Sequence, residues 1–353
     1  MASDPSELTY PELPATVEHV LRTLRDAGHE AVLVGGAVRD QLLGLTHGTW
    51  DWDAATSAAP EQVAELFPHT TWENRFGTVT VRGMPPVEVT SYRAEAGYRD
   101  ARRPDEVRFG VSLEEDLRRR DFTINAIAWL PTDLGARRGR LVDPAGGVGD
   151  LRRGVLRTVG DPRDRFGEDA LRLIRAARLA ARFDLAVDPE TERAARELAA
   201  TSAGVSGERV RDELTRMLDL RPAPSRAFVL LERLGLLEAI LPELAALRGV
   251  PQAKRVPGDA LDHTLAAVDA VPADAPDDTR LAALLHDLGK ATTGGDGHFI
   301  DHERVGADLA RGVLDRLRVA RARTERIVKV IEHHMYHYEP GWTDAAVRRF
   351  VRR

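Results

Sequence analysis

The segment VGGAVRDQLLGLTHGTWDWDAAT, residues 34–56, contains the two motifs on which the predicted fold depends. The first is a short apolar strand that ends in Gly35-Gly36 and is followed at once by a helical pattern. Backbone N–H groups at such a turn are free to hold phosphate, and Arg39 adds positive charge nearby. On its own, the glycine pair is better explained by a tight strand-to-helix turn with no ligand.

The second motif is the pair of aspartates in the strand that closes this segment. Because side chains alternate along a strand, Asp51 and Asp53 lie on one face and Trp52 turns into the core. Carboxylate oxygens are the ligands that Mg²⁺ takes in phosphoryl transfer. Two motifs in this order indicate phosphate and metal chemistry more strongly than either does alone.

Composition restricts the class of protein. The 353 residues are 43% hydrophobic and 30% charged, which is ordinary for a globular chain of two or three domains. The absence of cysteine excludes a disulfide framework and cysteine-bound zinc. The sequence also shows no leader pattern and no long apolar run, so we expect a soluble cytoplasmic protein without a membrane span. A net charge of −6 argues against a protein that coats nucleic acid, although arginine runs in the first half allow a local basic surface.

Hydrophobic periodicity divides the chain into two halves. Residues 31–145 mix strands and helices, with a hairpin over 77–93, whereas strand signals nearly vanish after Gly167. Amphipathic patterns predict continuous helices over residues 15–28, 168–183, 189–199, 207–218 and 225–241. The glycine-rich residues 137–154 are expected to break regular structure and to act as a hinge.

The glycine turn and the D-x-D strand together resemble the nucleotidyltransferase head of the polymerase-β type. In that superfamily a third carboxylate on a neighbouring strand completes the site, and Glu88 in VEVTSYR is the candidate, although it also fits a solvent-facing strand position. Four further motifs follow in order: RRRDFTINAIAW (118–129), LVDPAGGVGDLRRGVLRTVGDP (141–162), RFGEDALRLIRAARLAARF (165–183) and GERVRDELTRML (207–218). With them, essentially the whole chain resembles the class II tRNA nucleotidyltransferase and bacterial poly(A) polymerase family.

This resemblance implies an α+β fold, in which a small mixed sheet with flanking helices forms a polymerase-β-like head and an all-α neck and body follow. We expect the catalytic head in residues 1–145, a helical neck with a base-reading motif in 146–220, and a helical body with an HD-type region in 221–353. The final residues, 341–353, begin a helix without an end signal, so we expect the chain to be truncated or to end in a short natural tail.

The resemblance also assigns roles to residues. Asp51 and Asp53 would bind two Mg²⁺ ions, with Glu88 as a third catalytic carboxylate. The residues implied to bind the nucleotide are Gly35, Gly36, Arg39, Arg119, Arg120, Asp121, Asn125, Asp169, Arg172 and Arg175. Among these, Asp169 and Arg172 would read the Watson–Crick edge of CTP or ATP from one face of a helix. Without the neighbouring motifs, Glu168, Asp169 and Arg172 fit an acid at a helix start with an ion pair along the helix.

A charged segment over residues 93–109 is expected to be a mobile loop. As the resemblance has it, enzymes that add only two cytidines shorten or lose this loop, whereas those able to add the final adenosine keep it. The segment is present here, which favours CCA addition or A addition.

Histidines concentrate after residue 260. His263, the pair His286-Asp287, His302 and the pair His333-His334 lie on several predicted helices, and such sets build transition-metal sites in helical bundles. The adjacent His-Asp pair resembles the HD phosphohydrolase superfamily. The metal ligands expected from it are His263, His286 and Asp287, whereas hydrolytic activity stays open because the usual further aspartate is not evident.

The function expected from the sequence is template-independent addition of CCA, or of its terminal A, to the tRNA 3′ end from CTP and ATP. The 3′-hydroxyl would attack the α-phosphate and release pyrophosphate. One alternative is poly(A) polymerase of the same family, against which the HD-type region weighs. Another is an HD-type metal-dependent phosphohydrolase whose head binds RNA. The partners expected are tRNA and nucleotides, and the oligomeric state stays open.

Overall fold

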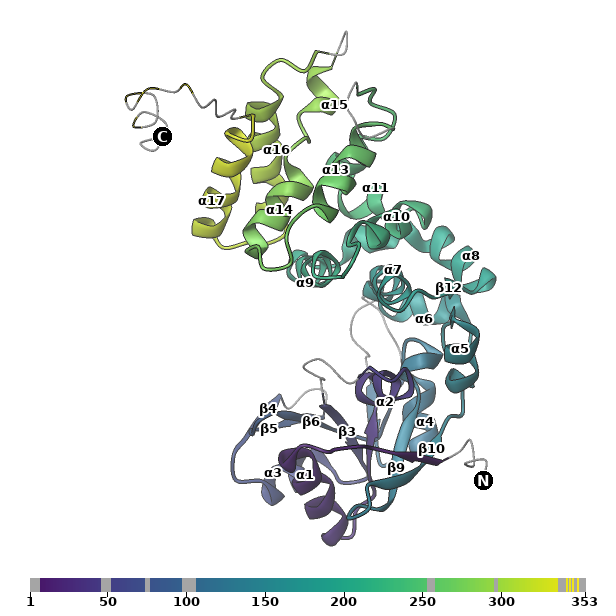
Figure 1. Cartoon of the computed structure of the whole chain (residues 1–353). Coiled ribbons are helices and arrows are strands. Elements are labelled where there is room, and N and C mark those ends of the chain that lie inside the picture. The colour runs from purple at the N-terminus through teal and green to yellow at the C-terminus, as the bar shows by residue number, and fades with distance from the viewer. Residues whose placement is uncertain are drawn as a thin grey trace. The chain divides into compact units, whose positions relative to one another are not determined.

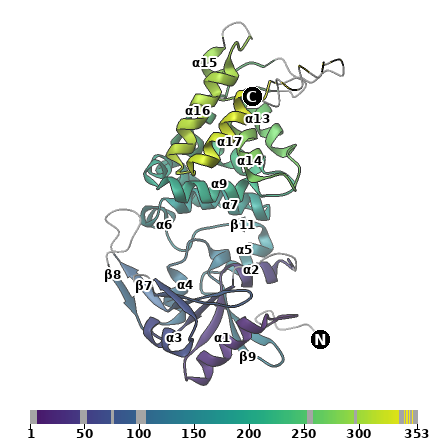
Figure 2. The same ribbon diagram turned by 90° about the vertical axis from the view of Figure 1, so that its left-hand side faces the viewer.

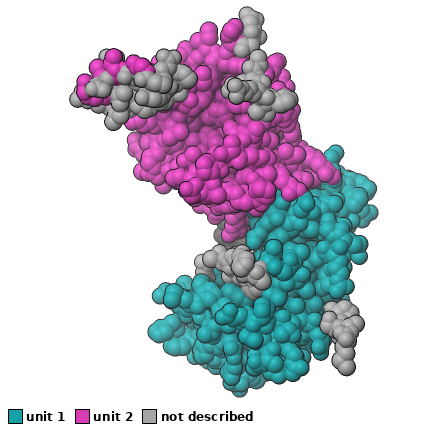
Figure 3. Space-filling model, in the orientation of Figure 1, with its two compact units in different colours: residues 1–202 teal, residues 203–353 magenta. Residues whose placement is uncertain are grey.

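The protein is described from a computed structural model, which covers residues 7–45, 52–73, 77–96, 106–252, 258–294 and 298–335, with 341, 343, 345 and 348. The chain forms two compact units, residues 1–202 and 203–353, which Figure 3 colours separately. Asp51 and most of residues 341–353 lie outside the described residues.

The first unit is built on a mixed sheet of eight strands in the order β1-β10-β9-β2-β3-β6-β5-β4. Strands β3 and β6 are parallel, and the other neighbours are antiparallel. The strands of this sheet are β1 Glu7–Thr9, β2 Ala31–Val34, β3 Trp52–Thr56, β4 Thr70–Glu73, β5 Thr78–Val81, β6 Val87–Ser91, β9 Ala128–Asp133 and β10 Arg138–Val142. Two short pairs accompany it: β7 Arg93–Ala96 with β8 Glu106–Phe109, and β11 Val155–Leu156 with β12 Ala186–Val187. The mixed sheet and the hairpin β5–β6 are as predicted.

Helices cover the sheet and continue beyond it (Figure 1). They are α1 Ala15–Asp26, α2 Gly36–Leu42, α3 Pro60–Leu66, α4 Leu113–Arg118, α5 Gly147–Arg153, α6 Pro162–Glu168, α7 Leu171–Phe183 and α8 Pro189–Leu198, with short 3₁₀ turns η1 Thr123–Asn125 and η2 Ala199–Gly204. Helix α1 buries the apolar stripe Val17, Val20, Leu21 and Leu24, and its neighbours include β2, β3 and α3.

The sheet face that meets α4 positions the site. Val32, Val34 and Ala55 on this face form one apolar cluster with Leu113 and Leu117 of α4. Because residues opposite one another in a ladder share a face, Asp53, which lies opposite Val34, points to the α4 side just beyond this cluster. Helix α4, with the β7–β8 pair beside it (Figure 2), therefore ends close to the D-x-D strand.

Two sequence predictions are wrong in unit 1. Residues 137–154 are not irregular, because they contain β10 and α5, and the glycines at 146 and 154 take positive φ at the two ends of α5. The predicted helix over 168–183 is interrupted: α6 ends at Glu168, Asp169 is extended with φ −152° and ψ 104°, and α7 starts at Leu171.

The segment 93–109 is also more ordered than expected in its described part. Strands β7 and β8 pair antiparallel in register from Arg93↔Phe109 to Ala96↔Glu106. The predicted mobile loop is thus a hairpin at its base, and residues 97–105 lie outside the described residues.

The second unit is helical throughout its described part, as expected for the body. Its helices are α9 Gly207–Leu218, α10 Ser225–Arg233, α11 Leu236–Ile240, α12 Pro242–Ala245, α13 Ala260–Asp269, α14 Asp277–Leu285, α15 Lys290–Thr293, α16 His302–Arg316 and α17 Arg321–Glu332. The helix predicted over 225–241 is split at Gly235, whose φ of +73° ends α10 and begins α11. Among the described helices of both units, none is long and apolar enough to cross a membrane.

Candidate nucleotidyl-transfer site and histidine cluster

The glycine turn brings a carboxylate and a guanidinium together. Gly35 ends β2 with φ +70° and precedes α2, which begins at Gly36. A Cβ at Gly35 would lie 3.4 Å from both Asp53 Oδ2 and Arg120 Nη1. The missing side chain therefore leaves a small cradle lined by a carboxylate, a guanidinium and the start of a helix.

A second carboxylate lies beside Asp53. Strand β6 runs parallel to β3 with Asp53 opposite Glu88, so the two side chains share a face, and Glu88 is exposed. Trp52 is buried and points the other way, as predicted. Oxygen donors on neighbouring strands beside an open glycine turn fit a hard divalent cation such as Mg²⁺. Asp51, the other half of the D-x-D motif, lies outside the described residues.

Arg119 and Arg120 are held by a buried carboxylate that sequence reasoning missed. Asp116, in α4, is fully buried and accepts hydrogen bonds from Arg119 Nη2 at 2.8 Å, Arg120 Nη2 at 3.4 Å and the Arg93 backbone N–H at 3.3 Å. Burial opposes ionisation of Asp116, but the charges of Arg120 and Arg119 outweigh it and lower its pKa. The helical spacing of three and four residues from an acid to two arginines is the signal that could have found it.

The candidate base-reading residues lie where the helix is broken. Asp169 is outside both helices, and its Oδ1 accepts from the Leu171 backbone N–H at 3.1 Å. Arg172 lies in the first turn of α7, where its Nη1 donates to the Arg165 carbonyl at 3.0 Å and pairs with Glu168 at 2.5 Å. The prediction that Asp169 and Arg172 lie on one face of a continuous helix is therefore wrong, because the backbone at Asp169 is extended and Asp169 lies outside α6 and α7.

The remaining predicted nucleotide-binding residues contact one another. Arg39 donates to Asn125, Asn125 donates to Asp121, and Asp121 accepts from Arg175. Burial opposes ionisation of Asp121, but the Arg175 charge and the hydrogen bonds from Asn125 and Arg175 lower its pKa well below the usual range. Arg39 and Asn125 are buried.

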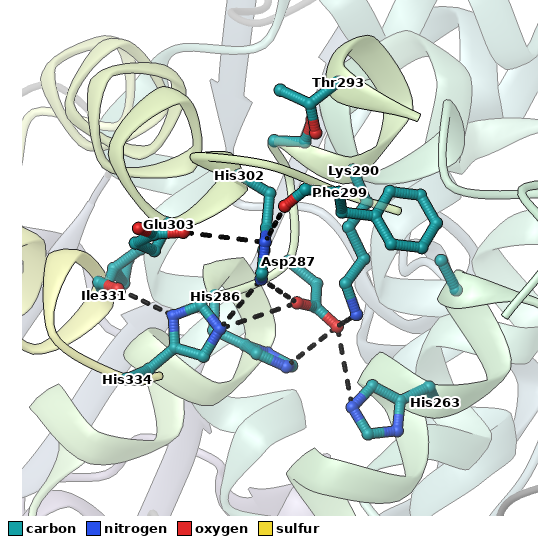
Figure 4. Close-up of polar contacts among 12 residues, drawn as sticks. His263, His286, Asp287, Lys290, Thr293, Phe299, His302, Glu303, Ile331 and His334 are labelled. Carbon is teal, nitrogen blue, oxygen red and sulfur yellow. Dashed lines mark hydrogen bonds and ion pairs between the residues drawn. The ribbon is translucent and has the colours of Figure 1, made fainter. Parts of the chain in front are cut away.

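A second cluster of ligating side chains lies in unit 2 (Figure 4). Asp287 is fully buried, and its Oδ2 lies 3.1 Å from His286 Nε2 and 3.5 Å from His263 Nε2. Its Oδ1 lies 3.5 Å from His302 Nε2 and 3.7 Å from His334 Nε2, and accepts no hydrogen bond among the described residues. The structure thus brings the three predicted HD-type residues together and adds His302 and His334.

The backbone fixes the tautomers of three of these histidines. The Nδ1 atoms of His286, His302 and His334 lie 2.7–2.9 Å from the carbonyl oxygens of Ala283, Phe299 and Ile331. A carbonyl only accepts, so Nδ1 of each histidine carries a proton, and Nε2, which faces the cluster, is the nitrogen left to bind a metal. His302 and His334 approach to 3.3 Å through Nε2, an arrangement that a shared cation would relieve.

Of two further residues near the cluster, Lys290 contacts Asp287 and His333 does not. Lys290 is buried and donates from Nζ to Asp287 Oδ2 at 2.5 Å. Burial opposes ionisation of Asp287, but the contacts with His286 and Lys290 outweigh it and lower its pKa. His333, although adjacent to His334, is directed to the Lys329 carbonyl and does not join the cluster. Imidazole nitrogens and a carboxylate are a donor set that suits transition metals.

Comparison with known proteins gives three matches to family models along the chain. The Poly A polymerase head domain matches residues 31–157, the probable RNA and SrmB-binding site of polymerase A matches 184–247, and the HD domain matches 260–348. Fold and site therefore define a polymerase-type nucleotidyltransferase head joined to an HD domain.

Individual relatives narrow this class. The A-adding tRNA nucleotidyltransferase of Deinococcus radiodurans is 38% identical over 92% of this chain and 72% of its own length. The crystal structure of the Bacillus stearothermophilus CCA-adding enzyme in complex with CTP matches with TM-score 0.60 and 32% identity, over 95% of this chain and 81% of that chain. The chain belongs to the tRNA nucleotidyltransferase and poly(A) polymerase family, as the sequence motifs predicted.

The match to other relatives is partial. The CCA-adding enzyme of Lactobacillus helveticus is 46% identical over 59% of this chain, and the chain spans about half of that relative, 51% of its length. Membership of a nucleotidyltransferase family implies dependence on a divalent metal ion.

Proposed function

We propose that this chain is an RNA nucleotidyltransferase that adds CCA, or the terminal A, to the tRNA 3′ end from CTP and ATP. The proposal rests on one observation: Asp53 Oδ2 and Arg120 Nη1 both lie 3.4 Å from the point where a Cβ of Gly35 would stand. A carboxylate for a metal, a guanidinium for phosphate and free N–H groups at a helix start are the parts that nucleotidyl transfer requires.

The proposed metal is Mg²⁺, held by Asp51 and Asp53 with Glu88 beside them. When bound, the ions supply charge neutralisation at the phosphates and activation of the 3′-hydroxyl. The protein's own part is positioning. Gly36 offers its N–H to the triphosphate at the start of α2, while the Gly35 N–H donates to the Ile127 carbonyl and Gly35 leaves the space beside it open. Asp116 orients Arg119 and Arg120. Pyrophosphate would leave from the arginine side.

Asp169 and Arg172 are proposed to read the base. An acceptor and a planar donor fork together match the edge of a cytosine or an adenine, so the side chains replace a nucleic-acid template. Arg172 contacts Glu168 and the Arg165 carbonyl, and these contacts keep its guanidinium in one orientation. A fixed orientation is required for a hydrogen-bonding side chain to distinguish one base from another.

The division into head (1–145), neck (146–220) and body (221–353) is part of the proposal, and the boundary between the compact units, at 202/203, falls within the neck. The named activities of the relatives favour tRNA over poly(A) synthesis. Recognition of tRNA would depend on shape and phosphates, which suits arginine patches on an acidic chain working in the cytoplasm.

Nucleotide transfer with labelled ATP and CTP onto a tRNA transcript tests the proposal, with wild-type protein and Asp53→Asn compared in Mg²⁺. We expect loss of transfer in the variant by about 1,000-fold while tRNA binding and the unfolding temperature stay unchanged. Thr90→Val, a change on the strand next to Asp53 and away from the glycine turn, is the matched control and should retain activity. Equal activity of Asp53→Asn and wild type would refute the proposed site.

A second function is proposed for the histidine cluster: metal-dependent hydrolysis of a phosphoester. The observation behind it is the convergence of the Nε2 atoms of His302 and His334 on the Asp287 Oδ1 atom, which accepts no hydrogen bond among the described residues. A transition-metal ion bound there would supply an activated water. The test measures Zn²⁺, Mn²⁺ or Ni²⁺ bound per chain and release of phosphate from p-nitrophenyl phosphate, with Asp287→Asn as the variant and His333→Asn as control. Retention of metal by Asp287→Asn would contradict the assignment.

A further inference from the structure

Four residues that the sequence assigned to nucleotide binding are joined in one hydrogen-bonded network. Arg39 Nη1 donates to Asn125 Oδ1, and Asn125 Nδ2 donates to Asp121 Oδ1 at 3.1 Å. Asp121 Oδ2 accepts from Arg175 Nε at 2.9 Å and Nη2 at 2.6 Å. Hydrogen bonds therefore run from helix α2, through the turn η1, to the middle of helix α7.

A second connection joins the same two helices further along α7. Arg39 Nε donates to Asp40 Oδ1 at 2.8 Å, and Asp40 Oδ2 lies 3.4 Å from Arg182 Nη2 at the end of α7. The guanidinium carbon of Arg39 stands 4.2 Å from the ring centroid of Phe183, the last residue of α7. We call the residues Arg39, Asp40, Asn125, Asp121, Arg175, Arg182 and Phe183 the α2–α7 network.

Arg39 is the centre of this network and is only 5% exposed. All three of its side-chain nitrogens are engaged, Nε and Nη2 by Asp40 and Nη1 by Asn125, and a face of the guanidinium is covered by Phe183. Arg39 Nη2 also borders the glycine turn, 3.5 Å from where a Cβ at Gly36 would stand, but a triphosphate bound there would compete with Asp40 and Asn125 for the guanidinium.

The two helices joined here begin at the two halves of the proposed nucleotide site. Helix α2 starts at Gly36 in the glycine turn Gly35-Gly36, which we call the phosphate turn. Helix α7 starts two residues after Asp169 and carries Arg172 in its first turn. Arg172 Nη2 also approaches the Arg119 carbonyl at 3.4 Å. The contacts between α2 and α7 therefore set the distance between the phosphate turn and the base-reading residues.

We propose that Arg39 is a positioning residue that, through the α2–α7 network, fixes the base-reading residues Asp169 and Arg172 relative to the phosphate turn and so sets nucleotide selection. The inference rests on the proposed function. Misplacement of aligned groups by about 1 Å costs up to about 100-fold in rate, so a loosened α7 would discriminate poorly between bases while phosphate binding persists.

The test uses the full chain and a tRNA transcript that ends in CC. The selection ratio, kcat/KM for ATP over kcat/KM for CTP, is measured for wild type, Arg39→Met, Arg39→Lys and Phe183→Leu. Inhibition by inorganic pyrophosphate reports on phosphate binding, and thermal unfolding reports on folding. Arg196→Met, which removes an exposed arginine of α8 paired with Glu192, is the matched control.

We expect the selection ratio to fall by about 10-fold or more in Arg39→Met, and by about 3-fold to 10-fold in Phe183→Leu, with the pyrophosphate inhibition constant unchanged within about twofold. Arg39→Lys should not restore selection, because an ammonium keeps the charge but cannot reproduce the planar contacts with Asp40, Asn125 and Phe183.

Two results would overturn the inference. If Arg39→Met leaves the selection ratio unchanged but weakens inhibition by pyrophosphate, and Arg39→Lys restores that inhibition, Arg39 is a phosphate ligand. If neither the selection ratio nor the pyrophosphate inhibition constant changes, the network has no role in selection. If Arg39→Met does not fold, Phe183→Leu and Arg39→Lys decide the question. Wild-type protein that transfers no nucleotide would refute the proposed function instead, so the two failures are distinguishable.

Discussion

Replacing Asp116 with asparagine would remove the buried charge that holds two arginines of the proposed triphosphate site. The carboxylate is fully buried, whereas the side chains of Arg119 and Arg120 retain 16% and 17% exposure. Breaking a buried charge pair from one side costs about 3–5 kcal/mol. Asparagine keeps one oxygen for Arg119, so we expect about 3 kcal/mol, at the lower end.

Thermal unfolding followed by circular dichroism measures this loss. For a unit of about 200 residues, about 3 kcal/mol corresponds to a decrease in Tm of about 6–12 °C in the transition of unit 1. Glu18→Gln, which removes one partner of the surface pair with Arg22 on α1, is the matched control and should leave Tm nearly unchanged.

The pH dependence of the effect gives an independent check. The pKa of Asp116 is lowered in the folded state, so its ionisation stabilises the fold above its unfolded pKa of about 3.9. This contribution disappears as the pH falls through the folded pKa, and the difference between wild type and Asp116→Asn should shrink there. A Tm decrease no larger than that of Glu18→Gln, or a difference undiminished at about pH 2–3, would refute the reasoning.

Three further changes have defined outcomes. Gly289→Ala would place a Cβ 2.1 Å from the carbonyl oxygen of His302, a residue of the histidine cluster, so we expect Zn²⁺ content per chain to fall. Gly312→Ala, in open space on α16, should retain metal and raise the free energy of unfolding in urea by up to about 1 kcal/mol. Gly147→Ala would meet a backbone carbonyl oxygen at 2.0 Å, and urea unfolding should show a loss of about 2–3 kcal/mol; an unchanged midpoint would contradict the packing. Glu88→Gln, an exposed strand change, should lower kcat for nucleotide transfer by about 100-fold without moving Tm, and unchanged kcat would exclude Glu88 from the site.

The sheet and the glycine turn were predictable because local patterns determine them. A short apolar run predicted β2, the D-x-D alternation predicted β3, and the glycine pair marked the turn between β2 and α2. The order of the later motifs then identified the family. These signals depend on neighbours in sequence, which a single chain records directly.

The break at Asp169 was not predicted, because residues 168–183 contain neither glycine nor proline. The periodicity of residues 168–183 is that of one helix, and contacts distant in sequence, such as Arg165 and Arg172 donating to the Arg119 carbonyl, accompany the break. The partners of Arg39 were likewise hidden, since Asn125 and Phe183 lie far along the chain. Sequence spacing predicts that Arg39 lies near phosphate, and it does not predict that the side chain is buried among these partners.

Whether this chain completes tRNA 3′ ends is decided by the extension of three tRNA transcripts, one lacking CCA, one ending in C and one ending in CC, with CTP and ATP in Mg²⁺ and products resolved to one nucleotide. We expect growth of the first transcript to a complete CCA end, or addition of a single A to the third alone. No extension of any transcript, or long adenosine tails, would contradict tRNA 3′-end completion as the function of this chain.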